Sequence, residues 1–392
     1  MKIAIFSDTF APQINGVSTY VYQSALSLTA LGHDVRIFII QRPLRENEKT
    51  MELSKFDKNL QIHILPSLSF WGYPGERFYV ALGLALNKIR KFKPDIIHTH
   101  TLFGVGWEAV YCSKLFNIPL IGTHHTFFDH YLKYIYMDYK FAKNFSWRYT
   151  TIYYNFCDLI LSPTNSLAEV LKKYGVEKPI NILPNFIDTD FFRPAPESSR
   201  DVKSLIYMGR VSDEKSIDQV IKSVAIVKNK ISDIKLNIVG DGPARKSLEN
   251  LVQKLKLEDN VIFSGFAQGQ KLLDFLWGGS IFITASKSEN MPLSVLEAMA
   301  VGLPIIGVDA LGMPEIVKND QNGFIIPSDK PEIMAEKILE LIENNSLRKE
   351  FSLNSRKLAM NYSQEKVIKD LERIYQDLIN GIIPSSTTSS DF

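Results

Sequence analysis

Short apolar runs alternate with amphipathic stretches along the first half of the chain. The apolar runs predict buried strands at residues 3–7, 35–40, 62–65, 96–99, 120–123, 159–162 and 180–183. Helical periodicity separates most of them, as at 16–31, 78–92 and 105–116, and Gly32 suits the C′ position of the first helix. Alternation of strand and helix predicts βαβ units and a parallel sheet.

The same pattern restarts in the second half, with predicted strands at 205–208, 236–239, 281–284 and 305–308. Between the two series, Pro194 and Pro196 disfavour both helix and sheet, which predicts a linker at 191–202. The sequence therefore predicts two doubly wound, Rossmann-like α/β domains at 1–190 and 203–364. Helices are expected at 330–343, 347–360 and 365–380, and the Ser/Thr-rich tail 384–392 is expected to be disordered.

Composition narrows the class of protein without naming a function. The chain has 392 residues, 45% hydrophobic and 22% charged, which is typical of a soluble globular protein. Only two cysteines, no signal-peptide h-region and no apolar run of about 20 residues favour a cytoplasmic protein that meets membranes only at their surface. The net charge of +2, with 20 basic and 16 acidic residues in 1–190, does not indicate nucleic acid but is compatible with anionic lipid or phosphate.

The strongest candidate motif is the segment 288–300, because ligands of open α/β sheets bind beyond the carboxyl ends of the strands. The segment follows a predicted strand and begins a helix near Pro292, so backbone amides around Met291 and Leu293 can bind phosphate. Glu297 can accept hydrogen bonds from a ribose diol, and the preceding Glu289 can hold sugar hydroxyls. Asn290, between them, is a further candidate for a donor contact. The alternative is that Glu289 caps the helix and Glu297 is a solvated surface residue.

A second candidate is the loop after the first strand of the second half. Arg210 and Lys215 bring two cations close to Gly209, where the backbone can approach a ligand. Fixed cations stabilise a departing diphosphate more in the transition state than in the ground state. The alternative is a surface cluster of salt bridges with Asp213 and Glu214.

Two glycine loops are weaker candidates for donor contacts. Gly240 and Asp241 follow a predicted strand, and Gly16 begins a helix after the first strand, where its amide can face donor phosphates. Both also suit an ordinary strand-to-helix turn.

Five histidines, at positions 98, 100, 124, 125 and 130, follow two neighbouring predicted strands and invite a metal interpretation. We expect strand alternation to put these neighbours on opposite faces, and no cysteine joins them, so no metal is predicted. His125 is the best candidate for a polar contact to the sugar or acceptor, and burial is the alternative for His98 and His100. The Asp188–Asp190 pair is expected to form a turn and to bind no metal.

Residues 126–157 hold 13 of the 44 aromatic side chains, with basic residues between them. Phe127, Phe128 and Tyr131 are candidates for acceptor or membrane contact. A second aromatic patch, 70–74, precedes a basic helix; its candidates for an anionic membrane surface are Lys88, Arg90 and Lys91. The alternative, that these aromatics form core, stays open.

Together, the loops 12–16, 209–215 and 240–243, His125, and the glutamates of 289–297 resemble a family 4 retaining glycosyltransferase of the GT-B fold. The resemblance implies two Rossmann-like domains facing a central cleft, with helix 365–380 packing back on the first. It implies that Arg210 and Lys215 grip the donor diphosphate, Glu297 binds ribose, and Glu289 and His125 lie near the transferred sugar. It also implies retention of anomeric configuration with no bound metal or cofactor. Asn15, where a second glycine is frequent, and Asn290, where a small residue is usual, depart from the pattern.

Residues 125–131 further resemble the diacylglycerol glucosyltransferases, which implies glucosyl transfer from UDP-glucose to a lipid acceptor such as diacylglycerol in glycolipid biosynthesis. The expected mechanism is front-face substitution, in which a phosphate oxygen takes the acceptor's proton. Alternatives are a mannosyl- or N-acetylglucosaminyltransferase with another acceptor, a nucleotide-sugar epimerase, and a non-catalytic nucleotide-sugar-binding subunit.

Overall fold

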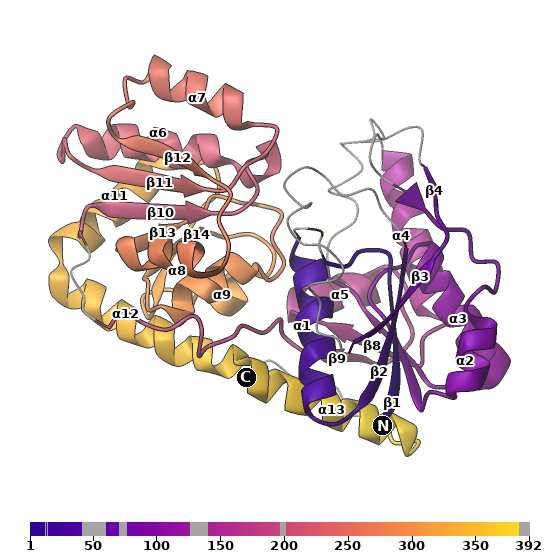
Figure 1. The fold of residues 1–392 in the computed structure, drawn as a ribbon. Helices are drawn as coiled ribbons and strands as arrows, with labels where there is room; N and C mark the ends of the chain where they lie inside the picture. The colour runs from indigo at the N-terminus through magenta and orange to yellow at the C-terminus, as the bar shows by residue number, and fades with distance from the viewer. Residues whose placement is uncertain are drawn as a thin grey trace. The chain divides into compact units, whose positions relative to one another are not determined.

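Two parallel sheets, each within its own compact unit, form the framework of the chain (Figure 1). The computed structural model describes residues 1–11, 13, 15–40, 60–69, 77–125, 140–196 and 201–383. The first unit comprises Met1–Asn185 and Glu365–Phe392, and the second comprises Phe186–Gln364. Two units with one parallel sheet each agree with the two Rossmann-like domains that the sequence predicts.

The first unit holds a seven-stranded sheet in the order β3-β2-β1-β6-β7-β8-β9, with every pairing parallel. Its strands are β1 (Lys2–Ser7), β2 (Asp34–Ile40), β3 (Gln61–Leu65), β6 (Ile96–Thr99), β7 (Leu120–Thr123), β8 (Leu159–Ser162) and β9 (Ile180–Ile182). The strand order runs outward in both directions from β1, which is the doubly wound arrangement. A short antiparallel hairpin joins β4 (Leu68–Ser69) and β5 (Arg77–Phe78).

The helices of this unit are α1 (Gly16–Ala30), α2 (Leu86–Phe92), α3 (Gly104–Phe116), α4 (Lys140–Tyr154), α5 (Asn165–Lys173) and the C-terminal α13 (Gln364–Ile379). Helix α1 ends where the sequence predicts, because Gly32 adopts φ +87°, a left-handed conformation that favours glycine. Helix α13 is tied to this unit by Glu372, which bonds His33 at 2.9 Å. Leu371 and Tyr375 of the same helix are fully buried.

The second unit holds a six-stranded sheet in the order β12-β11-β10-β13-β14-β15, again wholly parallel. Its strands are β10 (Ser204–Met208), β11 (Lys235–Val239), β12 (Val261–Gly265), β13 (Ile281–Ile283), β14 (Ile305–Val308) and β15 (Gly323–Ile326). Its helices are α6 (Ile217–Lys228), α7 (Arg245–Lys254), α8 (Gly269–Gly278), α9 (Leu293–Ala300), α10 (Met313–Ile316), α11 (Pro331–Glu343) and α12 (Asn345–Ala359), with 3-10 turns η3 (Asp213–Lys215) and η4 (Met360–Tyr362).

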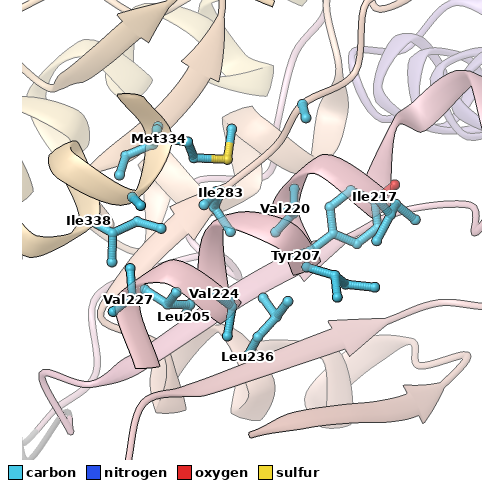
Figure 2. Close-up of a cluster of buried hydrophobic side chains, with 14 of the residues drawn as sticks. Leu205, Tyr207, Ile217, Val220, Val224, Val227, Leu236, Ile283, Met334 and Ile338 are labelled. Atoms are coloured by element: carbon cyan, nitrogen blue, oxygen red, sulfur yellow. The ribbon is translucent and has the colours of Figure 1, made fainter. Parts of the chain in front are cut away.

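Alternation along β10 fills a core on each face of the second sheet. Leu205 and Tyr207 belong to one buried cluster, and Ile206 and Met208 belong to the other. In the first cluster, apolar side chains of α6 at helical spacing pack with strand and α11 side chains, as Figure 2 shows for Val220, Val224, Val227, Leu236, Ile283, Met334 and Ile338. Burial on both faces explains why these strands are continuous apolar runs in the sequence.

The chain passes from the first unit to the second at Asn185 and Phe186, before the linker predicted at 191–202. Phe192, inside that predicted linker, is 7% exposed and packs in the buried cluster that contains Ile206 and Met208. Residues 197–200 of the predicted linker lie outside the described part of the chain. Asp188 forms the predicted turn, because its Oδ1 accepts hydrogen bonds from the amides of Asp190 and Phe191 at 3.1 and 2.9 Å. The predicted tail 384–392 also lies outside the described residues.

The predicted helix at 78–92 is wrong in its first half, since α2 begins only at Leu86. The buried carboxylate of Glu108 accepts hydrogen bonds from the amides of Gly83 and Ala85 at 2.9 and 2.8 Å and from the hydroxyl of Tyr79 at 3.0 Å. These bonds, together with φ +74° at Gly83, hold the segment in a non-helical course. The strands β12 and β15 and the β4–β5 hairpin were also not predicted.

Gly240→Ala is expected to lower the free energy of unfolding by about 2–4 kcal/mol. Gly240 has φ +143°, and a Cβ there would lie 1.9 Å from the carbonyl oxygen of Gly209, forcing the ends of β10 and β11 apart. Urea titration measures the effect. Gly278→Ala is the matched control, because it ends α8 with no atom within 4 Å of an added Cβ and should be neutral or slightly stabilising. Equal stability of the two variants would contradict the steric argument.

Candidate active site

Three loops that sequence analysis singled out lie at one edge of the second sheet, because β10, β11 and β13 are adjacent and parallel. The loops after β10 and β11 contact each other through backbone hydrogen bonds. The amide of Gly209 donates to Val239 O at 3.0 Å, and the amide of Val211 donates to Asp241 O at 3.0 Å. Only glycine fits at position 240, because an added Cβ would collide with the carbonyl oxygen of Gly209. The missing side chain also lets a ligand approach the backbone there.

Arg210 is exposed, and its guanidinium makes no hydrogen bond or ion pair within the described residues. Arg210 therefore does not join Asp213 and Glu214 in the surface salt-bridge cluster that the sequence left open as an alternative. The backbone beneath it is fixed, because the buried hydroxyl of Tyr207 donates to Arg210 O at 3.1 Å. Burial and the nearby Glu289 raise the pKa of Tyr207 well above its usual value, so this hydroxyl stays protonated. Tyr207 was not singled out from the sequence.

Lys215 ends the 3-10 turn η3 and forms an ion pair with Glu289 of the β13–α9 loop. The two side chains are 15% and 26% exposed, so the pair is largely withdrawn from solvent. The structure thus brings together two residues that lie 74 positions apart and that the sequence placed in one site. The alternative that Glu289 caps the following helix is not what the structure shows, because α9 has no capping side chain and Glu289 pairs with Lys215.

Helix α9 begins at Leu293, with Pro292 at its N-cap and no capping side chain. The amides of Leu293 and Ser294 donate to no acceptor within the described residues, so they keep the anion-binding capacity of a helix N-terminus. Neighbouring side chains turn inward: Asn290 is 4% exposed, and Met291, at 7%, belongs to the core. Any ligand contact from Met291 therefore falls to its backbone.

Glu297 lies one turn further along α9 and is half-buried. Its carboxylate has no hydrogen-bond or ion-pair partner among the residues that the structure describes, which argues against a solvated salt-bridging role. Burial without a partner raises the pKa of Glu297 to about 7. Such a carboxylate lacks the hydrogen bonds that a pair of ligand hydroxyls can supply. By contrast, Asp241 is engaged locally, since its Oδ1 accepts from Gly242 N at 2.8 Å and its Oδ2 lies 3.6 Å from Arg245.

In the first unit, α1 begins at Gly16 directly after β1 and its loop. Asn15 is the N-cap, and its side-chain oxygen accepts from the amide of Ser18 at 2.8 Å. This explains asparagine where the family resemblance has a second glycine, because Asn is among the best N-cap residues. The amide of Gly16 donates to no acceptor in the described part of the chain.

The histidines correct one sequence expectation. His98 and His100 were expected on opposite faces, but residues two apart on a strand share a face, and their ring centroids lie 4.0 Å apart. His125 joins them, with its Nε2 3.1 Å from Nδ1 of His100, while His124 faces away and bonds Tyr154. Both nitrogens of His98 are occupied, by the hydroxyls of Tyr375 and Thr123 at 2.6 Å each.

Burial lowers the pKa of His98 and of His125 to about 3, with a further contribution from neighbouring histidines, so these rings are neutral at pH 7. Within the described residues, no group of three or more His, Cys, Asp or Glu side chains is arranged to hold a metal ion. Tyr20 of α1 packs against His125 with ring centroids 5.1 Å apart. Sequence reasoning missed Tyr20 and Tyr375, since neither carries a local motif and Tyr375 lies 277 residues from its partner His98.

Two family profiles match the chain in succession, Glycosyltransferase Family 4 over residues 14–191 and Glycosyl transferases group 1 over residues 188–358. The chain belongs to the family 4 glycosyltransferases. Among solved structures, the Anabaena Alr3699/HepE complex with UDP is similar, with a TM-score of 0.78 and 16% identity, covering 96% of this chain and 100% of that one. Sucrose-phosphate synthase from Thermosynechococcus elongatus has the same TM-score at 17% identity, covering 97% and 100%.

Relatives of this glycosyltransferase include two proteins named alpha-monoglucosyldiacylglycerol synthase. The Streptococcus pneumoniae protein is 29% identical over 78% of this chain and 70% of its own length. The Acholeplasma laidlawii protein is 25% identical over 97% of this chain and 98% of its own. A GDP-mannose-dependent alpha-mannosyltransferase of Corynebacterium glutamicum is 26% identical over 83% of this chain and 76% of its own.

The described part of the aromatic segment contributes mainly to the core of this glycosyltransferase. Trp147, Tyr153 and Tyr154 are buried, whereas Phe145 and Phe156 are exposed. Phe127, Phe128, Tyr131 and the patch 70–74 lie outside the described residues. No helix in the described ranges combines the length and apolar character required to cross a bilayer.

The basic residues Lys88, Arg90 and Lys91 are all exposed on α2. The segment just before α2, which Glu108 holds, also exposes apolar side chains, with Val80, Leu82 and Leu84 at 46%, 69% and 45%. Apolar and cationic groups therefore adjoin one another along residues 80–91.

Proposed function

We propose that this glycosyltransferase moves glucose from UDP-glucose to a lipid acceptor such as diacylglycerol, at the cytoplasmic surface of an anionic membrane. The observation that carries the donor part is the ion pair of Lys215 with Glu289, which joins two loops at one edge of the second sheet. One loop carries Arg210, and the other leads to the free amides at the start of α9, the helix that contains Glu297. This set offers cations for a diphosphate and a carboxylate for a ribose diol. The names of the two diacylglycerol-directed relatives support the choice of sugar and acceptor.

In the proposed reaction, Arg210, Lys215 and the α9 amides bind the donor diphosphate and stabilise its charge as the glycosidic bond breaks. Gly16, Gly209, Gly240 and the 290–293 backbone are proposed to line the donor site. The acceptor hydroxyl attacks from the side on which the diphosphate leaves, a phosphate oxygen takes its proton, and the anomeric configuration is retained. Glu289 is proposed to exchange its ion pair with Lys215 for hydroxyls of the sugar, and His125 to contact the same sugar. No bound metal or cofactor is assigned to the reaction.

The test is transfer with purified protein and vesicles that contain diacylglycerol and an anionic lipid, offered UDP-glucose, UDP-N-acetylglucosamine, GDP-mannose or ADP-glucose in parallel. The expected result is an α-linked glucolipid from UDP-glucose alone, with EDTA having no effect. Preference for GDP-mannose would favour the mannosyltransferase alternative, which the Corynebacterium relative's name supports. Conversion of the nucleotide sugar without any acceptor would favour an epimerase.

Membrane association is expected to depend on the α2 cations. Arg90→Ala/Lys91→Ala should weaken binding to vesicles that contain anionic lipid by about 30-fold, since each basic residue near such a surface contributes about 1 kcal/mol. Flotation on a density gradient measures the effect. Lys172→Ala/Lys173→Ala is the matched control, because it removes two exposed cations from the last turn of α5 in the same unit. Equal losses for the two variants would mean that total charge, and not the α2 surface, governs binding.

A further inference from the structure

Helix α3 carries large apolar side chains on the side that it does not bury against the first sheet. Trp107, Tyr111 and Leu115 are spaced four residues apart, so they share one side of the helix. Val105 and Ala109 on the opposite side are fully buried where α3 packs on β1 and β6. Tyr111 and Leu115 are nevertheless 49% and 54% exposed, although the outward face of a helix that covers a sheet is ordinarily polar.

The loop before α2 continues this apolar face. A Cβ on Gly83 would lie 3.0 Å from Cε1 of Tyr111, so the loop backbone packs against that ring. Glu108, one turn before Tyr111 on α3, fixes the course of the loop by accepting hydrogen bonds from the amides of Gly83 and Ala85. The exposed apolar side chains of residues 80–84 are therefore held next to those of α3.

Helix α4 extends the same face beyond Trp107. The ring of Trp107 packs edge-on against that of Phe156, with centroids 5.6 Å apart, and its indole donates to the hydroxyl of Tyr149 on α4 at 2.7 Å. Phe145 and Ile152 of α4 are exposed, as is Phe156 just after the helix. We define the apolar surface of the first unit as Val80, Leu82, Leu84, Tyr111, Leu115, Phe145, Ile152 and Phe156. Contiguous apolar surface of this kind marks an interaction site, unlike single exposed apolar residues.

The charges on the helices of the apolar surface are almost all positive. Helices α2, α3 and α4 contain three, one and three Lys or Arg residues, and their single acidic residue, Glu108, is fully buried. One of these cations, Lys114, pairs with Asp158 at 3.6 Å. By contrast, α11 of the second unit contains four Glu and one Lys. The chemistry of this surface therefore fits a partner that is both apolar and anionic.

We propose that the apolar surface inserts shallowly into a bilayer that contains anionic lipid, with the α2 cations beside it at the headgroups. A bilayer supplies both parts, because Trp and Tyr rings favour its interface, acyl chains accept apolar side chains and anionic headgroups attract Lys and Arg. A second copy of the chain that met this surface with its own would oppose like charges. The proposal rests on the proposed function in that a lipid acceptor brings the enzyme to a bilayer, but insertion is measurable without donor or acceptor.

The direct test places an environment-sensitive fluorophore on one introduced cysteine. Cys112 and Cys157 are fully buried, so the label goes to Leu115→Cys or, in the control, to Leu353→Cys at an exposed position of α12 in the second unit. We expect vesicles of phosphatidylcholine and phosphatidylglycerol to shift the emission of the Leu115→Cys label to the blue and to leave the Leu353→Cys label unchanged. Unshifted emission at Leu115, or equal shifts at both positions, would overturn the proposal. A shift that needs no vesicles and grows with protein concentration would also overturn it, in favour of a second copy.

Tyr111→Ser/Leu115→Ser measures how much the apolar surface contributes to binding. We expect binding to the same vesicles, followed by flotation, to weaken about tenfold, because apolar area is no longer buried in the bilayer. Leu353→Ser/Met360→Ser is the matched control, since it removes two exposed apolar side chains from the second unit and should bind as the wild-type enzyme does. Equal binding by the two double variants would overturn the proposal. If Tyr111→Ser/Leu115→Ser does not fold, the label at Leu115 decides the question.

Salt separates the apolar surface from the α2 cations. The loss of binding in Arg90→Ala/Lys91→Ala should shrink as salt screens the attraction, whereas the loss in Tyr111→Ser/Leu115→Ser should persist. These vesicles contain no diacylglycerol and no donor is added, so a failure to transfer glucose would overturn the proposed function and leave insertion standing. Transfer to diacylglycerol in vesicles by an enzyme whose Leu115 label stays unshifted would do the reverse.

Discussion

Arg210→Ala is expected to lower turnover by about two to three orders of magnitude while leaving the free energy of unfolding within about 0.5 kcal/mol. Arg210 is exposed, and its guanidinium makes no hydrogen bond or ion pair within the described residues, so the substitution removes no contact that stabilises the fold. Turnover is expected to fall because the guanidinium no longer stabilises the charge that develops on the diphosphate as the sugar departs. Initial rates of sugar transfer and urea titration measure the two quantities on the same preparation.

The matched control is Lys222→Ala, which removes a cation from the exposed face of α6 in the same unit, where it pairs with Asp218 at 2.8 Å. It should change neither turnover nor stability appreciably. Arg210→Lys should recover part of the lost activity, because it restores the charge but not the planar fork of donors. Turnover of Arg210→Ala within threefold of the wild-type enzyme, with the protein folded, would remove Arg210 from the donor site.

The companion substitution Lys215→Ala should lower turnover to a similar extent but also reduce stability. Its removal leaves Glu289, 26% exposed, without its ion-pair partner. Lys215→Ala/Glu289→Gln should therefore regain stability relative to Lys215→Ala but no activity. This non-additivity distinguishes a residue that acts only on the ligand, Arg210, from one that also neutralises a neighbouring carboxylate.

Glu297→Gln is expected to change stability and ligand binding in opposite directions. At pH 8 the free energy of unfolding should rise by about 1–3 kcal/mol, because the wild-type enzyme holds a half-buried, ionised carboxylate without a partner. Affinity for UDP should fall by about 10- to 100-fold, because the charged acceptor for the ribose hydroxyls is lost. Urea titration and isothermal titration calorimetry measure the two effects.

The stability effect has a defined pH window. The pKa of Glu297 is about 7 in the folded enzyme, against an ordinary value of 4.5, so between these values the folded state binds more protons than the unfolded state. Wild-type stability from this group therefore declines as pH rises from about 4.5 through 7. The gain in Glu297→Gln should be near zero at pH 4.5 and complete above pH 7.

Glu336→Gln is the control for this pair of measurements, because Glu336 is exposed on α11 in the same unit. It should leave both stability and UDP affinity close to those of the wild-type enzyme. A Glu297→Gln enzyme that is less stable than wild type at pH 8 would show that Glu297 already has a stabilising partner. Unchanged UDP affinity would exclude Glu297 from the donor site.

The sequence by itself determined the fold class and predicted which loops share one edge of the second sheet. Strands buried on both faces are continuous apolar runs, so β1, β2, β6, β7, β8, β10, β11 and β14 were found within one or two residues of their bounds. Because the carboxyl ends of parallel strands share an edge, loops near Gly209 and Glu289 could be assigned to one site before any contact was known. The edge strand β12 was missed because its residues after Val261 are partly exposed and form no continuous apolar run. The edge strand β15 is largely buried, but it begins at Gly323 and its three apolar residues carry little signal.

Only the tertiary structure decided which side chains have partners. The sequence contains Lys215 and Glu289 but not their ion pair, and it contains His98, His100 and Tyr375 but not the contacts that join α13 to β6. It also could not reveal that Glu108 would hold residues 79–85 out of a helix. These outcomes depend on distances between residues remote in the chain, whereas periodicity reports only on which face of its own element a residue lies.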